Sequence, residues 1–445
     1  MNDSFLRNTD EHSRRRFLSY ASKTLLGVSI LPTMAPLGAF AAPVKKDAVA
    51  SAAPATPGRK PTARNIIYLY MAGGMTHVDT FDPKPGAGEK VAGPVKAIDT
   101  AADGVQISEY FPMLAKQMDK VAILRGLSTT QGAHDEGNYF MHSSYTMRGT
   151  IQHPGIGAWL QRMEGKTNRT LPGSVCIGGG SVGGGAGFME SKFAPLYVGS
   201  PTSGVPNSKS NVSTGEFEDR LMLSNKFDQA FHERYDQKKV RAYSDMYDDA
   251  VRLMKSEDLK AFDLSGESAE VRAEYGDNGF GQGCLLARRL VENDVRHVEV
   301  TLGGWDTHSN NFQAVEGLAG TLDKALGALL KDLERRGMLD ETMVVLCTEF
   351  GRMPTFQKGA SGRDHNPSGF TCILAGAGVQ TGAKHHGETD EFGWKAAVDV
   401  TSVYDFHATI LHLLGLEHEK ISYYHNGLER RLTDVHGHVI QSALA

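Results

Sequence analysis

Residues 284–347 read CLLARRLVENDVRHVEVTLGGWDTHSNNFQAVEGLAGTLDKALGALLKDLERRGMLDETMVVLC, and this stretch decides the fold. Apolar residues repeat with helical spacing over 284–292 and 318–333, which indicates two helices. A short apolar run of the buried-strand type follows each helix, at His297–Leu302 and Met343–Cys347. Because helix and strand alternate along the chain, the sequence predicts a three-layer α/β/α fold with a largely parallel sheet.

Further apolar runs extend this pattern towards both ends of the chain. They predict three more strands and a last helix, at Asn65–Met71, Val121–Leu124, Phe370–Leu374 and Val403–Leu414. The intervening residues 216–275 are polar and helical in pattern, with few strand signals, so we expect a helical insertion there. Residues 63–445 are therefore expected to form one folded domain with this insertion.

Composition excludes several classes of protein. The chain has 445 residues, with 47 Lys and Arg against 52 Asp and Glu, so no overall basic field exists to hold nucleic acid. Four cysteines are too few and too scattered for a disulfide scaffold. In contrast, the 17 histidines and 50 glycines are numerous.

The N-terminal segment resembles a twin-arginine export signal. Ser13-Arg14-Arg15-Arg16-Phe17-Leu18 precedes a mild apolar stretch that ends at Ala39-Phe40-Ala41, a small-x-small cleavage pattern. Pro32 and Pro36 interrupt this stretch, which argues against a membrane-spanning helix. We therefore expect residues 1–41 to be a signal peptide, with retention as an anchor as the alternative.

Export sets the expected location and partners of the chain. The Ala- and Pro-rich residues 42–62 have no apolar period and are expected to be a linker. The resemblance implies the twin-arginine translocase as a partner, a periplasmic or secreted location, and no integral membrane segment after cleavage.

Polar clusters rich in glycine follow three of the predicted strands. Their histidines and carboxylates are, in chain order, His77, Asp79, Asp306, His308, Glu349 and, shortly afterwards, His365. Imidazole with carboxylate suits zinc, manganese or iron, whereas carboxylates alone suit magnesium or calcium. Each cluster by itself is explained better by a turn network or an ion pair than by a ligand site. Because ligands bind at the carboxyl ends of parallel strands, the clusters together predict a metal site.

The chain resembles the bacterial exported family DUF1501 from about Asn65 to Ile440. The matching motifs are His77-Val78-Asp79-Thr80-Phe81-Asp82-Pro83-Lys84-Pro85, Gly304-Trp305-Asp306-Thr307-His308, Glu349-Phe350-Gly351-Arg352, Gly362-Arg363-Asp364-His365, and His407-Ala408-Thr409-Ile410-Leu411 running to Arg430-Arg431-Leu432-Thr433. This family resembles the alkaline phosphatase and sulfatase superfamily. That resemblance implies an alkaline-phosphatase-like fold and a pair of divalent metals held by residues such as Asp306, His308 and His365.

Three positions depart from the superfamily pattern. Phe350 stands where a histidine ligand is expected, within Glu349-Phe350-Gly351. The first strand ends without an aspartate, so Asp79 or His77 is the candidate substitute from the following loop. The nucleophile's helix is expected to start at residues 134–137, where no hydroxyl or thiol lies.

Two functions remain open on these residues. The first is an exported hydrolase of phosphate or sulfate esters that holds zinc, manganese or calcium, with His134 or Asp135 as the base for metal-bound water. Arg352 and Arg363 suit an anionic substrate oxygen, although structural ion pairs explain them equally well. The second is a non-catalytic binding protein on a hydrolase-like scaffold, with a glycan or an envelope component as its partner.

Overall fold

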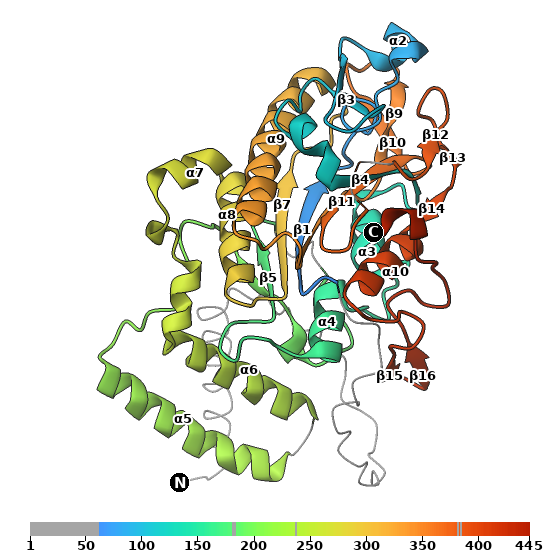
Figure 1. Cartoon of the computed structure of the whole chain (residues 1–445). Helices are drawn as coiled ribbons and strands as arrows, with labels where there is room; N and C mark the ends of the chain where they lie inside the picture. Colours follow the sequence, from blue (N-terminus) through green and yellow to red (C-terminus); the bar gives the residue numbers. More distant parts are fainter. Residues whose placement is uncertain (1–61, 180–183, 236–237, 381, 383–384) are drawn as a thin grey trace. The chain divides into compact units, whose positions relative to one another are not determined.

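The computed structural model describes residues 62–445 apart from 180–183, 236–237, 381 and 383–384 (Figure 1). The predicted export signal and all of the predicted linker except Thr62 lie outside these residues. The described chain divides into two compact units. One is residues 205–234, and the other, which holds the sheet, is residues 62–204 with 235–445.

Sixteen strands and nine α-helices are described in this part of the chain. The strands are β1 Asn65–Ala72, β2 Ala97–Asp99, β3 Gln106–Ser108, β4 Val121–Ser128, β5 Ser174–Ile177, β6 Leu196–Val198, β7 His297–Gly303, β8 Thr342–Cys347, β9 Gly351–Phe356, β10 Arg363–Asn366, β11 Phe370–Gly376, β12 Glu388–Thr389, β13 Ala396–Val398, β14 Thr401–Ser402, β15 Tyr423–His425 and β16 Leu428–Arg430. The helices are α2 Glu89–Ala92, α3 His134–Ser143, α4 Ile156–Glu164, α5 Thr214–Arg234, α6 Lys238–Met254, α7 Ala269–Tyr275, α8 Gly279–Glu292, α9 Asn311–Arg335 and α10 Val403–Leu413. None of them is long and apolar enough to cross a membrane.

The central sheet has eight strands in the order β14-β4-β11-β8-β1-β7-β5-β6. Strand β1 pairs in parallel with β7 on one side and with β8 on the other. Within the described sheet, β11 is the strand that pairs antiparallel with its neighbours, β4 and β8. The largely parallel sheet predicted from the alternating pattern is confirmed.

Helices cover both faces of this sheet, which gives the three layers (Figure 1). On one face, Tyr68 and Tyr70 of β1 belong to the same buried cluster as Phe140 of α3, Trp159 of α4 and Ile410 of α10. On the other face, α8 packs against β7 and β1, and α9 packs against α8. Because successive residues of a strand point to opposite faces, the all-apolar strands of the sequence are buried on both sides.

The structure lengthens several of the predicted elements. Strand β4 continues to Ser128, where the apolar pattern was interrupted by Arg125; that side chain donates hydrogen bonds to the carbonyls of Phe81 and Gln106. Helix α10 begins after Ser402, whose side chain forms a reciprocal capping box with Asp405. Residues 216–275, expected to be a helical insertion, contain most of α5 together with α6 and α7.

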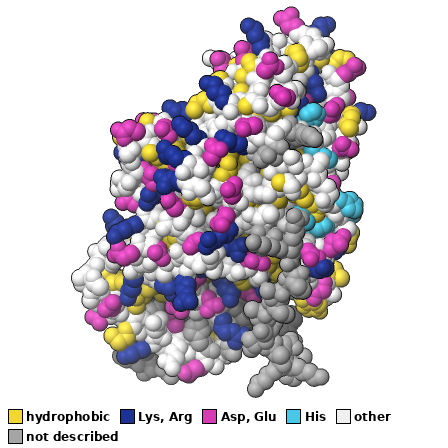
Figure 2. All heavy atoms as spheres, viewed as in Figure 1, with side chains coloured by type: hydrophobic (Ala, Val, Ile, Leu, Met, Phe, Trp, Pro, Cys, Tyr) yellow, Lys and Arg dark blue, Asp and Glu magenta, His cyan; other side chains and the backbone are white. Residues whose placement is uncertain are grey.

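Acidic and basic side chains are interspersed on the molecular face shown in Figure 2. Neither sign of charge gathers into a single field on this face. The near balance of charge in the sequence is thus also a local balance over the surface in view.

Two buried histidines make the stability of the protein depend on pH. Burial lowers the pKa of His297 to about 4 and that of His407 to about 3, from an ordinary value of 6.5. Below pH 6.5 these two histidines are therefore protonated in the unfolded chain but not in the folded chain. Their contribution to the free energy of unfolding is complete above that pH and is lost as the pH falls towards 4. We expect the midpoint of thermal unfolding to drop over this window, and the slope to be shallower in His407→Asn. An unchanged slope in that variant would contradict the assignment.

Candidate metal centre

Three adjacent strands of the sheet end side by side at one edge. Ala72 at the end of β1 pairs with Gly303 of β7, and Tyr70 pairs with Cys347 at the end of β8. The loops after these strands therefore begin at the same edge of the sheet. This edge carries the strand-end clusters that the sequence singled out.

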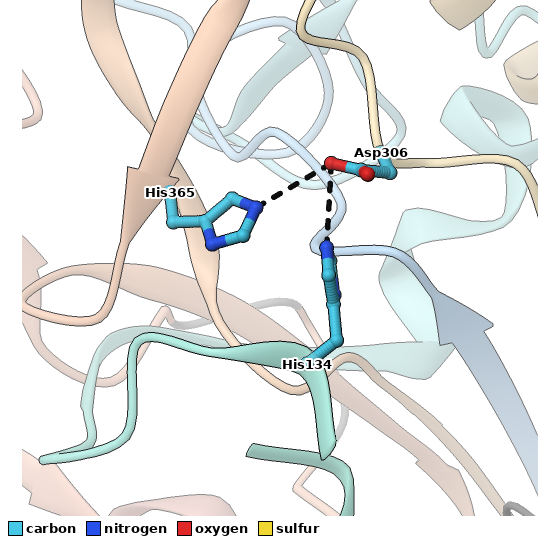
Figure 3. Close-up of side chains that lie close together, drawn as sticks. All are labelled: His134, Asp306 and His365. Carbon is cyan, nitrogen blue, oxygen red and sulfur yellow. Dashed lines mark ion pairs between the residues drawn. The ribbon is translucent and has the colours of Figure 1, made fainter. Parts of the chain in front are cut away.

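Side chains from three separate elements converge beside this edge (Figure 3). His134 is the first residue of α3, Asp306 lies in the loop after β7, and His365 lies in β10. Asp306 Oδ1 is 3.3 Å from His134 Nε2 and 3.4 Å from His365 Nε2. His308 Nε2 lies 3.0 Å from the same oxygen. We call these four residues the Asp306 cluster.

Hydrogen bonds fix which ring nitrogen of each histidine faces Asp306. His134 Nδ1 lies 2.9 Å from Glu349 Oε1, His308 Nδ1 lies 2.9 Å from Gln357 Oε1, and His365 Nδ1 lies 2.7 Å from the Gly132 carbonyl. Because each of these partners is an acceptor, each Nδ1 carries the proton and donates it. In the neutral form of each imidazole, Nε2 then carries the lone pair and faces the Asp306 carboxylate.

This donor set fits a divalent metal. His134 Nε2 is buried and has no hydrogen-bond partner among the described residues. His308 Nε2 and His365 Nε2 are 3.0 Å apart. In tetrahedral zinc, two ligand atoms lie about 3.3 Å apart, close to the separations from Asp306. A histidine whose other nitrogen donates to a carboxylate or carbonyl is also the usual arrangement in metal sites.

Asp306 remains ionised in this environment. Burial opposes ionisation, but the hydrogen bond and charge of Arg352 prevail, with His134 and His308 adding to them, and the pKa of Asp306 falls to about 2. The guanidinium of Arg352 is fully buried and also donates to the carbonyls of Gly73, Gly74 and Arg363. Asp306 is thus available as an anionic ligand at neutral pH.

Glu349 lies behind the cluster. Its Oε1 accepts hydrogen bonds from Gly73 N at 2.8 Å and from His134 Nδ1, while its Oε2 lies 3.1 Å from the Tyr70 hydroxyl. The hydrogen bond with Glu349 is the largest cause that raises the pKa of His134; the charges of Glu349 and Asp306 add to it, and burial opposes it. The structure therefore brings Glu349 to His134 and surrounds both of its oxygens with donors.

Phe350 packs directly against two histidines of the cluster. Its ring centroid is 5.1 Å from that of His134 and 4.6 Å from that of His365. The side chain is fully buried. Where the superfamily pattern expects a ligand, this chain has an apolar wall that restricts both imidazole rings.

A glycine after β1 lets the cluster form. Gly73 has φ +118, and a Cβ placed on it would lie 2.5 Å from the backbone nitrogen of Asp306. An alanine at this position would be strained and would displace the loop that carries Asp306. The glycine-rich strand end thus serves close approach between two loops of the chain.

The structure places Asp79 and His77 outside the Asp306 cluster. Both oxygens of Asp79 accept hydrogen bonds from Arg363, at 2.7 and 2.8 Å, and both side chains are buried. His77 is buried as well, and its Nε2 lies 2.8 Å from the Gly393 carbonyl. These residues tie loops together in a separate network, so the first-strand loop brings no ligand to the cluster.

The residues predicted to bind substrate are buried, whereas the two residues predicted as catalytic bases lie near the surface or in the cluster. Arg352 and Arg363 are almost fully buried, with carboxylates and backbone carbonyls as partners, so neither presents a free guanidinium to solvent. Asp135 is exposed in the first turn of α3. His134, which the sequence suggested as a base, lies instead among the candidate ligands.

Sequence reasoning missed two features of the site. Asp364, with His308 and His365, forms a second group of residues that could hold a metal ion. Asp364 lies in the motif Gly362-Arg363-Asp364-His365, but only His365 of that motif was predicted as a metal ligand. The contact between Tyr70 and Glu349 could not be predicted, because in the sequence Tyr70 is simply one residue of an apolar strand.

Comparisons with known proteins agree with the resemblance read from the sequence. A family model described as "Protein of unknown function (DUF1501)" matches residues 63–444, and no curated protein matches. Among solved structures, the sulfatase PsFucS1 from Pseudoalteromonas sp. is 14% identical, with 82% of this chain and 69% of that chain covered and a TM-score of 0.39. The alkaline phosphatase of the Antarctic bacterium TAB5 is 12% identical, with 72% and 93% covered and a TM-score of 0.31. A protein in the alkaline phosphatase superfamily from Vibrio parahaemolyticus is 13% identical, with 82% and 68% covered and a TM-score of 0.36.

Proposed function

This chain belongs to the family of proteins of unknown function DUF1501, and we propose that it is a metal-dependent hydrolase of phosphate or sulfate esters. The family predicted from the sequence is thereby confirmed. The proposed ligands are Asp306, His134 and His365, which lie close enough together to hold one metal ion, with His308 as a further candidate beside Asp306. The observation that carries the proposal is the convergence of three imidazole nitrogens on one carboxylate oxygen.

The surroundings of the cluster favour an anionic substrate. Helix α3 begins at His134, so the free N–H groups and the positive end of its dipole lie beside the candidate ligands. Asp306 retains 46% side-chain exposure and His308 retains 36%, so solvent and substrate can reach them. A helix N-terminus next to a cation site supports binding of an ester that carries negative charge.

Each residue of the site has a role in this proposal. A bound divalent metal would polarise an ester oxygen and lower the pKa of bound water. Glu349 holds His134 in the tautomer that presents Nε2, and Phe350 restricts the rings of His134 and His365. Asp135, exposed beside His134, is proposed as the base that accepts the proton of the attacking water.

A second candidate function rests on the number of ligands. Four protein ligands fill a tetrahedral site, and closed sites of this kind are structural, whereas catalytic sites keep an open position. If His308 completes the coordination, the chain is better described as a non-catalytic binding protein. Its partner would then be a glycan or an envelope component.

Metal analysis combined with an ester assay separates the two candidates. For the hydrolase we expect about one equivalent of a transition metal or more, and hydrolysis of p-nitrophenyl phosphate or sulfate that chelation abolishes and metal restores. Metal retained at full occupancy without hydrolysis of either ester would favour the binding protein. Less than one equivalent after exposure to zinc and manganese would reject the centre itself.

The cellular setting is part of the same proposal. The twin-arginine motif at Ser13–Leu18 supports export, and hence action in the periplasm or outside the cell. Attachment of a reporter to residues 1–41 tests this, because a functional signal carries a folded reporter out of the cytoplasm and a substitution of Arg14 with Arg15 by lysines blocks it.

A further inference from the structure

A row of polar residues runs along the face of α3 that meets the sheet. His134, Asn138 and His142 are spaced four residues apart, which places them on one side of the helix. Opposite them lie Tyr70 of β1 and Glu299 of β7. Such an interface between helix and sheet is ordinarily apolar, so the polar row requires a physical reason.

Tyr70 lies at the centre of this row. Its hydroxyl has one proton and two acceptors within reach, Glu349 Oε2 at 3.1 Å and the side-chain oxygen of Asn138. Its ring lies 4.5 Å from that of His142, centroid to centroid. The side chain has no exposed surface, so its hydroxyl has only these protein partners within the described residues.

The contacts of Tyr70 lead to the Asp306 cluster in two steps. The hydroxyl fixes Oε2 of Glu349, and Oε1 of the same carboxylate accepts the proton of His134 Nδ1 at 2.9 Å. A carboxylate held at both oxygens cannot rotate about its terminal bond. Its orientation therefore dictates which nitrogen of His134 carries the proton and where Nε2 points.

We propose that Tyr70 is a positioning residue of the metal centre, which acts by holding Glu349 so that His134 presents Nε2 to the metal. This inference rests on the proposed function, because it assigns His134 as a ligand. It adds a residue that contacts neither the metal nor the substrate. Loss of an outer partner of a metal ligand lowers metal affinity by about 10- to 100-fold, and because Tyr70 acts on that partner, Glu349, we expect Tyr70→Phe to lower it by about 10-fold, the low end of the range.

The neighbouring tyrosine of the same strand provides a matched control. Tyr68 is as deeply buried as Tyr70, but its hydroxyl makes no hydrogen bond within the described residues. The Cys347 thiol is its near neighbour. Tyr68→Phe removes the same atom from the same strand without touching Glu349, so its metal affinity is expected to stay within twofold of the parent protein.

Two measurements test the proposal. Titration with Co²⁺ against a chromogenic chelator gives the affinity of Tyr70→Phe, Tyr68→Phe and the parent protein. Nitrogen NMR of the metal-free proteins, with ¹⁵N-labelled histidine, gives the tautomer of His134. The parent protein is expected to show the Nδ1–H form alone, and Tyr70→Phe a mixture of both tautomers.

The outcomes are distinguishable from failure of the proposed function. If the parent protein binds no Co²⁺, the hydrolase proposal fails, and the tautomer of His134 still decides the role of Tyr70. If Tyr70→Phe keeps both the tautomer and the affinity of the parent, the positioning role is rejected. Should Tyr70→Phe not fold, Asn138→Ala keeps the phenol and removes the acceptor that competes with Glu349 for its proton, so the affinity for Co²⁺ is expected to rise. An affinity no higher than that of the parent in a folded Asn138→Ala protein would then reject the proposal.

Discussion

Replacing Asp306 by alanine is expected to abolish metal binding. Asp306 Oδ1 is the atom that the three Nε2 atoms surround at 3.0–3.4 Å, so its loss leaves neutral imidazoles without the anionic ligand. The affinity should fall by more than the roughly 100-fold expected for losing an outer partner of a ligand. Metal content after dialysis and Co²⁺ titration of the purified variant measure this change.

Asp364→Ala is the matched control for this variant. Asp364 is also an exposed carboxylate near His308, and it belongs to the other group that could hold a metal ion. We expect Asp364→Ala to retain its metal. The reverse pattern, with metal kept in Asp306→Ala and lost in Asp364→Ala, would move the centre to the second group. Thermal unfolding of the metal-free variants shows whether each one is folded.

Replacing Asp79 by alanine is expected to destabilise the protein by about 3–5 kcal/mol. The carboxylate pairs with Arg363 through two hydrogen bonds and accepts two more, from Asn311 at 2.8 Å and Thr76 at 2.9 Å. Both members of the pair are almost fully buried, at 0% and 1% side-chain exposure. Without Asp79 the guanidinium stays buried with an uncompensated charge. Urea unfolding followed by circular dichroism gives the change in free energy.

An exposed ion pair of the same types provides the comparison. Arg64 and Asp294 are 2.6 Å apart, but their side chains are 48% and 43% exposed. Arg64→Ala should therefore cost no more than about 1 kcal/mol. Metal affinity of the folded Asp79→Ala protein is expected to match the parent, because Asp79 lies outside the cluster. Loss of metal in a protein that is still folded would return Asp79 to the ligand set.

The local pattern of apolar residues was sufficient to predict most of the fold. The apolar runs that predicted strands at Asn65–Met71 and Met343–Cys347 lie within one residue of β1 and β8 at each end. Because such strands are buried on both faces, apolar and polar residues do not alternate along them. The resulting continuous apolar run is visible in the sequence itself. Strand boundaries were predicted less accurately where a polar side chain interrupts the apolar pattern, as Arg125 does within β4 by donating a hydrogen bond to the Phe81 carbonyl.

The site was predicted less completely, because pairing between distant residues leaves no local signal. Asp306, His308 and His365 were identified by residue type and strand-end position, and the structure brings them together. The same reasoning selected Asp79 and His77, whose spacing is equally suggestive. Only the position of Arg363, which meets Asp79 across 284 residues of sequence, separates an ion pair from a ligand.

By itself, the sequence identified the family through its motifs. It also determined the alternation of helix and strand, the parallel sheet, and the edge at which the polar clusters gather. These follow from periodicity and strand order, which local residues encode. The tertiary structure alone decided that His134 joins Asp306, that Glu349 and Tyr70 lie behind it, and that Arg352 and Arg363 are buried. Those roles depend on sub-ångström placement and on burial, and both arise only when loops distant in the chain pack against one another.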